Sequence, residues 1–501
     1  MNLMYRSTRD SSRRVTASQA VLQGLAPDGG LFVPETVPVF QKTVKELSEL
    51  DYRETAYEVM RLFLTDYTEE ELKDCIASAY DAKFDTPEIA PLRKAGEACF
   101  DKVWYLELFH GATIAFKDMA LSILPHLLTK AARKNKVEEE IVILTATSGD
   151  TGKAALSGFA DVAGTRIIVF YPKDGVSPVQ EKQMVTQKGE NTHVIGIRGN
   201  FDDAQTGVKN IFSDKDLAAR LKAGGYQFSS ANSINIGRLV PQIVYYVYSY
   251  ISLYKRGELA EGEKINFVVP TGNFGNILAA YYAKSMGLPI DKLICASNEN
   301  KVLYDFFKTG CYDRNREFIL TESPSMDILV SSNLERLIYH IADGDSDRTA
   351  ELMKALSARG AYDITPQMKA NLAGFFGGWA SGAETREAIA KAYKEHGYVI
   401  DTHTAVAAGV YDKYAAETGD TTKTVIVSTA SPYKFGSSVL EALGLPEIPK
   451  DDYEQALLLA EVSKTEIPKA VEELRMAPVR HTKICDTEEM QEMVKEILKI
   501  I

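Results

Sequence analysis

One lysine lies in a segment that could give it unusual reactivity. Residues 110–118 read His-Gly-Ala-Thr-Ile-Ala-Phe-Lys-Asp, so Lys117 follows Phe116 and shortly precedes the apolar run that starts at Met119. A lysine is usually a solvated charge, but burial in such a setting lowers the pKa of an amine from its free value of about 10.4. An amine with a lowered pKa can act as a nucleophile or as a general base. Lys117 is therefore the candidate catalytic residue.

A glycine-containing turn further along the chain is suited to a phosphate. Residues 271–276 read Thr-Gly-Asn-Phe-Gly-Asn, between an expected strand that ends at Pro270 and an expected helix that begins near Ile277. A strand, a turn and a helix N-terminus direct free backbone N–H groups at one point, which favours an anion. Gly272 and Gly275 would let the backbone approach that anion, although a turn that needs glycine only for its dihedral angles would look the same. The chain has no Gly-x-Gly, so the dinucleotide fingerprint is absent.

A second turn, at residues 147–152, reads Thr-Ser-Gly-Asp-Thr-Gly and is followed by Lys153. It superficially resembles a phosphate-binding loop of an ATPase, but that motif needs glycine at position 147 and a hydroxyl residue at position 154, which is Ala154 here. The hydroxyls of Thr147, Ser148 and Thr151 instead suit a carboxylate or phosphate of a small substrate. A hydroxyl-rich helix cap is the alternative interpretation.

The elements that must position these residues form an α/β pattern. Apolar β-branched runs alternate with helical patterns, which is typical of an open, mainly parallel sheet. The apolarity is continuous rather than alternating, which indicates strands covered on both faces. Strands are predicted at residues 141–145, 166–170, 193–197, 265–269, 293–296 and 424–428. Helices are predicted at 153–163, 203–212, 241–255, 277–286, 348–358 and 384–396, and Pro125 should kink or shorten the helix after Lys117.

Composition excludes several classes of function. The chain has 501 residues, of which 45% are apolar and 25% charged, so we expect an ordinary globular protein of about three domains. Its 57 basic and 69 acidic residues give a net charge of −12, which argues against a nucleic-acid partner. The five cysteines form no Cys-x-x-Cys pair and no His-x-x-x-His pair occurs, so we expect free thiols in a reducing compartment and no metal site.

The apolar runs and the N-terminal segment indicate the cellular compartment in which we expect the protein. No apolar run reaches the length that spans a bilayer. The N-terminus carries several arginines and serines, as a transit peptide does, but lacks the apolar stretch of a secretory signal. We therefore expect a cytoplasmic protein without a membrane partner.

One lysine and two anion-binding turns on α/β loops describe a site for a phosphorylated carbonyl cofactor and an anionic amino acid. With these elements in order, the chain resembles the threonine synthase family, whose members depend on pyridoxal phosphate and have the tryptophan-synthase-β-like fold, called fold type II. The similarity runs nearly from end to end. It is carried by residues 5–9, 24–34, 110–118, 147–152, 232–235 with Arg238, 272–276, 323–328, 331–333 and 428–430.

The resemblance implies a role for each motif. Lys117 would be the Schiff-base lysine, Thr429 the partner of the pyridine nitrogen, and Asp150 a residue facing the cofactor ring. A neutral hydroxyl such as that of Thr429 would not hold the ring nitrogen protonated, so the ring would be a weaker electron sink. The cofactor phosphate would be held by Gly272, Asn273, Phe274, Gly275 and Asn276. The substrate would be bound by Thr147, Ser148, Gly149, Thr151, Asn232, Ser233, Asn235 and Arg238, the last with a cationic fork suited to phosphate.

The implied fold has two open, twisted, mainly parallel sheet domains with the cofactor in the cleft between them, an N-terminal helical region and helical insertions. The expected division is 1–95 for the N-terminal region, 96–205 for a small domain with the lysine, 206–445 for a large cofactor-binding domain with an insertion at about 300–400, and 446–501 for a helical, strand-poor extension. Two positions depart from many family members, which have proline where this chain has Ala112 and histidine where it has Ser431.

The implied reaction converts O-phospho-L-homoserine and water to L-threonine and phosphate, the last step of threonine biosynthesis. The same scaffold could instead eliminate phosphate and release 2-oxobutyrate, and local motifs do not separate the two outcomes. Either a monomer or a homodimer is compatible with the sequence.

Overall fold

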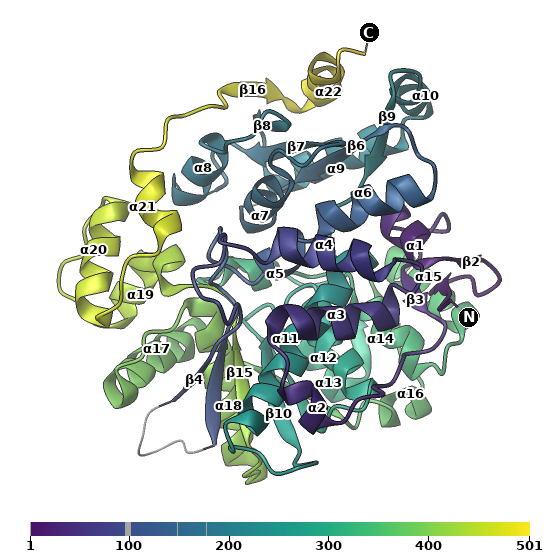
Figure 1. Cartoon of the computed structure of the whole chain (residues 1–501). Coiled ribbons are helices and arrows are strands. Elements are labelled where there is room, and N and C mark those ends of the chain that lie inside the picture. The colour runs from purple at the N-terminus through teal and green to yellow at the C-terminus, as the bar shows by residue number, and fades with distance from the viewer. Residues whose placement is uncertain (1, 96–101, 148, 177, 501) are drawn as a thin grey trace.

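The computed structural model describes residues 2–95, 102–147, 149–176 and 178–500, and it contains two mainly parallel sheets (Figure 1). The larger sheet has six strands in the order β14-β11-β10-β15-β5-β4, and only its edge strand β4 runs antiparallel. The smaller sheet has five parallel strands in the order β16-β8-β7-β6-β9. The predicted α/β fold with two mainly parallel sheets is confirmed.

The strand bounds show which chain segments build each sheet. The larger sheet contains β4 (Leu92–Lys94), β5 (Val103–Glu107), β10 (Ile265–Pro270), β11 (Ile290–Ser297), β14 (Phe375–Trp379) and β15 (Thr424–Ser428). The smaller sheet contains β6 (Glu140–Ala146), β7 (Thr165–Pro172), β8 (Thr192–Arg198), β9 (Tyr226–Ser229) and β16 (Lys483–Asp486). All six predicted strands are present. Their inner residues are buried without alternation, as expected for strands covered on both faces.

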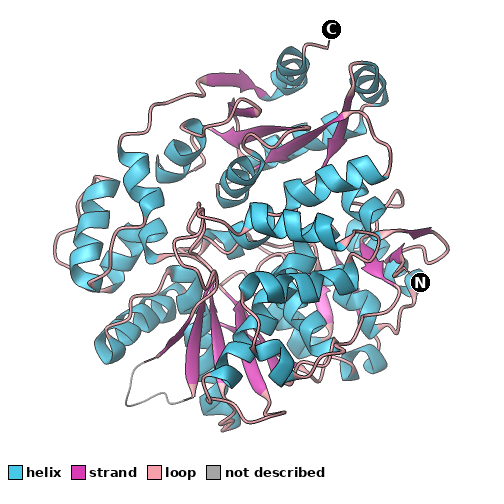
Figure 2. Ribbon diagram, in the orientation of Figure 1, coloured by secondary structure: helices cyan, strands magenta, loops and turns pink. Residues whose placement is uncertain are grey.

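Helices cover both faces of each sheet (Figure 2). The predicted helices are confirmed, and Pro125 lies in the first turn of α6, where it separates α5 from α6. Up to α10 the helices are α1 (Ala17–Gln23), α2 (Val44–Ser48), α3 (Tyr52–Phe63), α4 (Glu69–Ala79), α5 (Asp118–Leu121), α6 (Leu124–Lys134), α7 (Asp150–Phe159), α8 (Pro178–Val185), α9 (Phe201–Ser213) and α10 (Lys215–Ala223). From α11 on they are α11 (Ile236–Lys255), α12 (Gly275–Ser285), α13 (Val302–Thr309), α14 (Leu334–Ile341), α15 (Ser346–Arg359), α16 (Pro366–Ala370), α17 (Gly382–His396), α18 (Thr402–Thr418), α19 (Gly436–Ala442), α20 (Asp452–Ser463), α21 (Lys469–Arg475) and α22 (Met490–Leu498).

One hydrophobic cluster joins the two sheets. It contains Ile143 and Val169 from the smaller sheet, Phe267 and Leu293 from the larger one, and most of the buried face of α11 between them. Helix α11 packs against α3 and α12, so the N-terminal helices belong to the same core. The outer faces of the sheets have separate cores, one under α17 and α18 and one under α9 and α22. One continuous hydrophobic core therefore holds the loops that lie between the two sheets.

Strands β14 and β16 lie where the sequence pattern indicated helical regions. Strand β14 falls inside the insertion expected at 300–400 and pairs with β11 at the edge of the larger sheet. Strand β16 lies in the expected helical extension and crosses back to pair with β8. The expected C-terminal extension is helical apart from residues 483–486, where Cys485 is the one buried residue of the strand. The division of the chain into four regions stays a prediction.

The remaining strands form small antiparallel units. A three-stranded sheet near the N-terminus contains β1 (Tyr5–Ser7), β2 (Arg14–Val15) and β3 (Phe32–Pro34), in the order β2-β1-β3. A two-stranded unit pairs β12 (Cys311–Asp313) with β13 (Ala361–Asp363). No helix among the described residues is both long and apolar enough to cross a membrane.

Candidate active site

Lys117 caps the short helix α5 in the loop after β5, and its backbone is tied to the loop after β15. The Phe116 N–H donates to the Thr429 carbonyl at 2.8 Å, and the Ser431 N–H donates to the Ile114 carbonyl at 3.0 Å. The Lys117 side chain is 12% exposed. Burial lowers the pKa of its amine, an effect that the neighbouring Asp150 opposes. The low exposure and the lowered pKa expected for Lys117 from its apolar surroundings are both present.

A buried carboxylate connects the lysine to the smaller sheet. Asp150 is the first residue of α7, which follows β6, and its Oδ2 lies 3.3 Å from the Lys117 Nζ. Its Oδ1 lies 3.1 Å from the Nζ of Lys434, whose side chain is only 1% exposed. Burial alone would raise the pKa of Asp150, but the two lysines hold it well below its ordinary range. Asp150 is therefore an ionised carboxylate between two amines.

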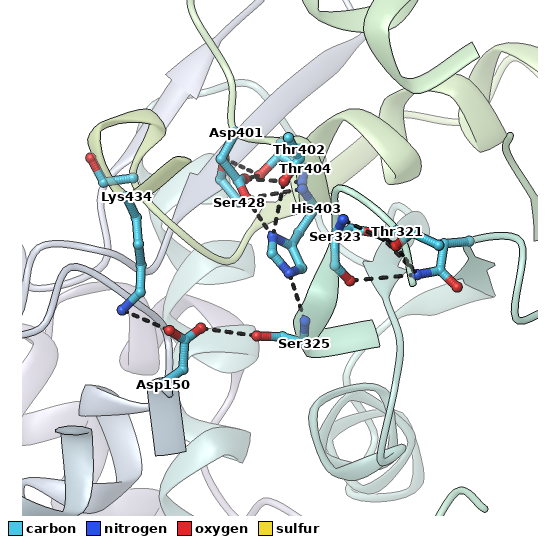
Figure 3. A network of polar contacts seen from close by, with 12 residues as sticks. Asp150, Thr321, Ser323, Ser325, Asp401, Thr402, His403, Thr404, Ser428 and Lys434 are labelled. Carbon is cyan, nitrogen blue, oxygen red and sulfur yellow. Dashed lines mark hydrogen bonds and ion pairs between the residues drawn. The ribbon is translucent and has the colours of Figure 1, made fainter. Parts of the chain in front are cut away.

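Ser325 completes the contacts of the Lys117 amine, and Figure 3 shows its contacts with Asp150 and His403. It lies in the 3₁₀ turn Pro324–Met326, and its Oγ is 3.1 Å from the Lys117 Nζ and 2.9 Å from the Asp150 Oδ2. Its backbone N–H donates to the His403 Nε2 at 3.2 Å. The other ring nitrogen of His403 lies 2.8 Å from the Oδ2 of Asp401, which is fully buried. The backbone contact thus fixes the His403 tautomer with its proton on Nδ1.

The glycine turn at 271–276 lies next to this group. A Cβ atom on Gly272 would lie 2.7 Å from the Ser325 carbonyl oxygen, so only glycine fits there without displacement. Phe274 adopts a left-handed backbone conformation with φ of 65°, which ends the turn and starts α12 at Gly275. Asn333 holds the turn from outside, because its backbone N–H and its side-chain Nδ2 both donate to the Asn273 carbonyl, at 3.0 and 3.1 Å.

Asn276 offers an unused donor at the start of α12. Its Oδ1 accepts from the hydroxyls of Tyr245 and Tyr246, each at 2.6 Å. These two bonds fix the orientation of the amide, and its buried Nδ2 has no hydrogen-bond partner among the described residues. A buried donor without a partner is costly, so this one is suited to a ligand oxygen.

Arg238 offers a second unused donor, in the first turn of α11. It is 3% exposed, its Nη1 donates to the Ala231 carbonyl at 2.9 Å, and its Nε has no partner among the described residues. Burial lowers the pKa of this guanidinium to about 10. The nearby Ser233 hydroxyl accepts from the Asn333 Nδ2 at 3.2 Å, so Asn333 bridges the glycine turn and the turn before α11. Asn235 caps α11, Asn232 is exposed beside it, and the amide of Asn235 also donates to the Val21 carbonyl at 3.0 Å.

The turn at 147–152 is held by its own side chains. The Thr147 Oγ1 accepts from the backbone N–H groups of Gly149 and Gly152, at 3.0 and 2.9 Å, so this hydroxyl shapes the turn. Gly149 has φ of 138°, and a Cβ atom there would lie 2.3 Å from the Gln180 side chain. Thr151 is partly exposed at the start of α7, and Ser148 lies outside the described residues. The proposed substrate roles of Thr147, Gly149 and Thr151 stay predictions.

The proposed site residues meet at the carboxyl ends of parallel strands. Lys117 follows β5, Asp150 follows β6, the glycine turn follows β10 and Thr429 follows β15. Thr429 is 4% exposed, and its own carbonyl anchors the lysine loop. This is where open α/β sheets bind ligands. Sequence reasoning assigned no role to three residues of the network, namely Ser325, His403 and Lys434. Ser325 stands in a motif that carries the family resemblance, whereas no local pattern marks His403 and Lys434.

The residues present fit a phosphorylated aldehyde. A buried lysine with a lowered pKa can bind the carbonyl, and the glycine turn at the N-terminus of α12, with the free Asn276 amide, can hold the phosphate. Among the described residues, no group of three or more His, Cys, Asp and Glu side chains could hold a metal ion. Fold and site together define a pyridoxal-phosphate dependent enzyme, and the family profile of that description matches residues 82–430.

Two further profiles identify the family within that class. The profile described as the threonine synthase N-terminus matches residues 4–80, and the threonine synthase C-terminal profile matches residues 404–496. Threonine synthase from Saccharomyces cerevisiae is 36% identical over 518 residues, which cover 98% of each chain. The chain belongs to the threonine synthase family, and its cofactor is pyridoxal phosphate.

Solved structures agree with this assignment. The crystal structure of threonine synthase from yeast has a TM-score of 0.88 and 34% identity and covers 100% of this chain and 99% of its own. The pyridoxal-phosphate-bound threonine synthase from Brucella melitensis has a TM-score of 0.85 and 33% identity, with 99% of both chains covered. Threonine synthase-like 1 from Homo sapiens is 40% identical over 466 residues, and the match spans 90% of this chain but only 61% of that protein.

Proposed function

We propose that this protein is a threonine synthase, which converts O-phospho-L-homoserine and water to L-threonine and phosphate. The observation that carries the proposal is the pair of unused buried donors, Arg238 Nε and Asn276 Nδ2, on two separate anion-binding turns. One turn is suited to the cofactor phosphate, and the other to the phosphate or carboxylate of a substrate. An enzyme of this fold that acts on an unphosphorylated amino acid would not need two phosphate sites.

Each residue has a proposed role. The cofactor would be held by Lys117, Asp150, Thr429 and the turn from Gly272 to Asn276, and the substrate by Thr147, Ser148, Gly149, Thr151, Asn232, Ser233, Asn235 and Arg238. When bound, the cofactor withdraws electrons from the substrate's α-carbon. Lys117 removes the proton from that carbon and moves protons at the β-carbon, while Arg238 holds the phosphate that leaves. Asp150 keeps the Lys117 amine directed into the site.

The test is to supply O-phosphohomoserine and to quantify phosphate, threonine and 2-oxobutyrate. Equal amounts of phosphate and threonine support the proposal. Phosphate with 2-oxobutyrate supports the lyase alternative. The variant Lys117→Ala should lose turnover by at least about 10⁴-fold, since both a positioned base and the covalent anchor are removed. It should also lose the visible absorbance of the bound cofactor.

The surroundings of the enzyme follow from the same proposal. Four described cysteines, Cys75, Cys295, Cys311 and Cys485, are free thiols, as is usual in the cytoplasm, where we place the protein. The proposal is compatible with a monomer or a homodimer. The binding partner of the enzyme is its small-molecule substrate, O-phospho-L-homoserine.

A further inference from the structure

Ser325 makes a contact that the proposed function does not use. Its Oγ is within hydrogen-bonding distance of both the Lys117 amine, at 3.1 Å, and the Asp150 carboxylate, at 2.9 Å. An ionised carboxylate can only accept, so the Ser325 hydroxyl must donate its proton to Asp150. The lone pairs of the Ser325 oxygen then face Lys117 and accept one of its N–H groups. The direction of this contact is therefore determined.

Two accepting oxygens fix the orientation of the Lys117 amine. A tetrahedral ammonium has three N–H groups, of which one points to the Asp150 Oδ2 and one to the Ser325 Oγ. With two of the three directions held, the third is fixed as well. With Asp150 alone, the amine could rotate about its bond to Cε, and the position that delivers a proton to the substrate would no longer be unique.

Two buried residues of α18 hold Ser325 in place. The His403 Nε2 accepts the Ser325 backbone N–H, and the Asp401 Oδ2 holds the opposite ring nitrogen (Figure 3). Asp401 is fixed in turn, because it caps α18 by accepting from the backbone N–H groups of His403 and Thr404, at 2.9 and 3.0 Å. Serine, histidine and aspartate are the residue types of a hydrolytic triad, but here the imidazole contacts the serine backbone rather than its hydroxyl. The imidazole therefore positions the loop and does not activate a nucleophile.

The loop around Ser325 is anchored independently on its other side. The Asn298 Nδ2 donates to the Ser323 Oγ at 3.0 Å and to the Asp327 Oδ1 at 2.7 Å. Ser323 is a buried serine two positions away, and within the described part of the chain its hydroxyl bonds to the side chains of Asn298 and Thr321. The chain therefore offers a matched control for Ser325.

We propose that Ser325 is a further catalytic residue, which directs the Lys117 amine toward one carbon of the substrate, and that His403 and Asp401 are its positioning residues. This inference rests on the proposed function. It assigns to Ser325 the choice between products. After phosphate has left and the γ-carbon has taken up a proton, water adds at the β-carbon and a directed amine returns a proton to the α-carbon, which gives threonine. A rotating amine lets the α,β-unsaturated enamine leave before water adds, and hydrolysis of that enamine gives 2-oxobutyrate and ammonium.

The experiment compares the holoenzyme variants Ser325→Ala and Ser323→Ala. Ser325→Ala keeps the backbone N–H that His403 holds, so the loop should stay in place. We expect its threonine formation to fall by about 10- to 100-fold, as for a reacting group that has lost its orientation, with KM for O-phosphohomoserine within about threefold. The share of 2-oxobutyrate per phosphate released should rise about tenfold. Ser323→Ala should match the parent in both quantities.

Histidine variants test the positioning residue. His403→Ala removes the acceptor of the Ser325 N–H and should shift the product ratio in the same direction, by a smaller factor. His403→Gln can return an acceptor oxygen near the position of Nε2 and should restore part of the threonine. If Ser325→Ala does not fold, Ser325→Cys keeps the volume with a poor acceptor and should give the same product shift.

A second readout separates this inference from the proposed function. The visible absorbance of bound pyridoxal phosphate changes with pH according to the charge on the Lys117 nitrogen. Loss of the Ser325 contact should move the midpoint by about half a pH unit or more. If the parent enzyme makes no threonine, the proposed function is wrong. The pH midpoint of the absorbance change then tests by itself whether Ser325 contacts the Lys117 nitrogen. A Ser325→Ala enzyme whose product ratio and absorbance midpoint both equal those of Ser323→Ala overturns the inference.

Discussion

The two sides of the site differ in how their polar groups are paired. On the amine side, which we define as Lys117, Asp150, Ser325, Lys434 and His403, each side chain has a partner within 3.3 Å. On the anion side, which we define as Arg238, Asn276 and the turn at 272–276, two buried donors have no partner among the described residues. Paired groups orient a reacting atom, whereas unpaired donors are free for a ligand oxygen, at a cost to stability of about 1 to 3 kcal/mol each. The difference separates residues that control chemistry from residues that control binding.

Among the variants that test this difference in pairing, the one with the largest expected effect lies on the anion side. Arg238→Met should raise KM for O-phosphohomoserine by roughly 10²- to 10³-fold, because it removes a charged donor that a substrate phosphate would use. The same variant should unfold at an equal or higher temperature, since an apolar chain of similar length replaces a buried cation that has no carboxylate partner among the described residues. Steady-state kinetics and thermal unfolding of the same preparation check both effects. A clear loss of stability would contradict the difference between the two sides.

The amine side should respond in the opposite way. Lys434→Met leaves the buried Asp150 carboxylate with Lys117 as its one remaining ion-pair partner among the described residues, and should cost about 3 kcal/mol of unfolding free energy, as the loss of one partner of a buried ion pair does. Denaturant unfolding measures this cost. The control is Lys413→Met, whose ion pair with Glu384 at 2.6 Å is 43% exposed at the lysine, so its cost should stay below about 1 kcal/mol. Equal losses of unfolding free energy in the two variants would show that the buried ion pair of the amine side stabilises the protein no more than an exposed pair does.

Gly272 lies at the boundary between the sides. The variant Gly272→Ala would bring its Cβ to 2.7 Å from the Ser325 carbonyl, so either the glycine turn or the Ser325 loop must move. We expect pyridoxal phosphate to bind roughly tenfold more weakly, measured by absorbance titration of the apoprotein. The control Gly382→Ala, with its nearest neighbour 3.7 Å away, should leave the affinity unchanged.

The smallest effect concerns His110, the first residue of the lysine segment. Its Nδ1 lies 2.6 Å from the Asp85 Oδ1 and its Nε2 2.9 Å from the Glu107 Oε2. Burial alone would lower the pKa of His110, but the two carboxylates raise it to about 9. Because the folded-state pKa is the higher one, the stabilisation is complete below the unfolded pKa of about 6.5 and is lost as the pH rises through about 9.

The variant His110→Gln tests this pairing. The parent should be more stable than the variant by about 1 kcal/mol near pH 6, after allowance for the exposure of Asp85, and the difference should shrink as the pH rises toward 10. Thermal unfolding at several pH values measures it. A difference that is constant with pH would show that the charge of His110 does not contribute.

The sequence predicted the central strands of both sheets, apart from β5, because their apolar runs are continuous. It did not predict the outer strands. Strand β14 contains Gly377 and Gly378, β16 has one fully buried residue in four, and β9 has only one buried residue. Edge strands of this kind are stabilised by pairing with a neighbour, and a pairing between residues hundreds of positions apart leaves no local pattern.

The same reason limits the prediction of the site. Lys117 and the glycine turn were recognisable because each needs a local arrangement, an apolar segment or a turn before a helix. The amine of Lys117 is oriented by Ser325, 208 residues later in the chain, and Ser325 is held by His403, a further 78 residues on. Such contacts form only after both sheets have assembled, so no spacing between residues in the sequence predicts them.

The path of β16 has a consequence for how the chain is made. Residues 483–486 cover the open edge of β8, at residues 192–198, so that edge has no partner strand until residues 483–486 have been synthesised. An uncovered strand edge is a template for pairing with another chain. During translation, β8 is therefore exposed for the time needed to add almost 300 residues, at roughly 5 to 20 residues per second. A chaperone that binds nascent chains would find a long-lived target at this edge.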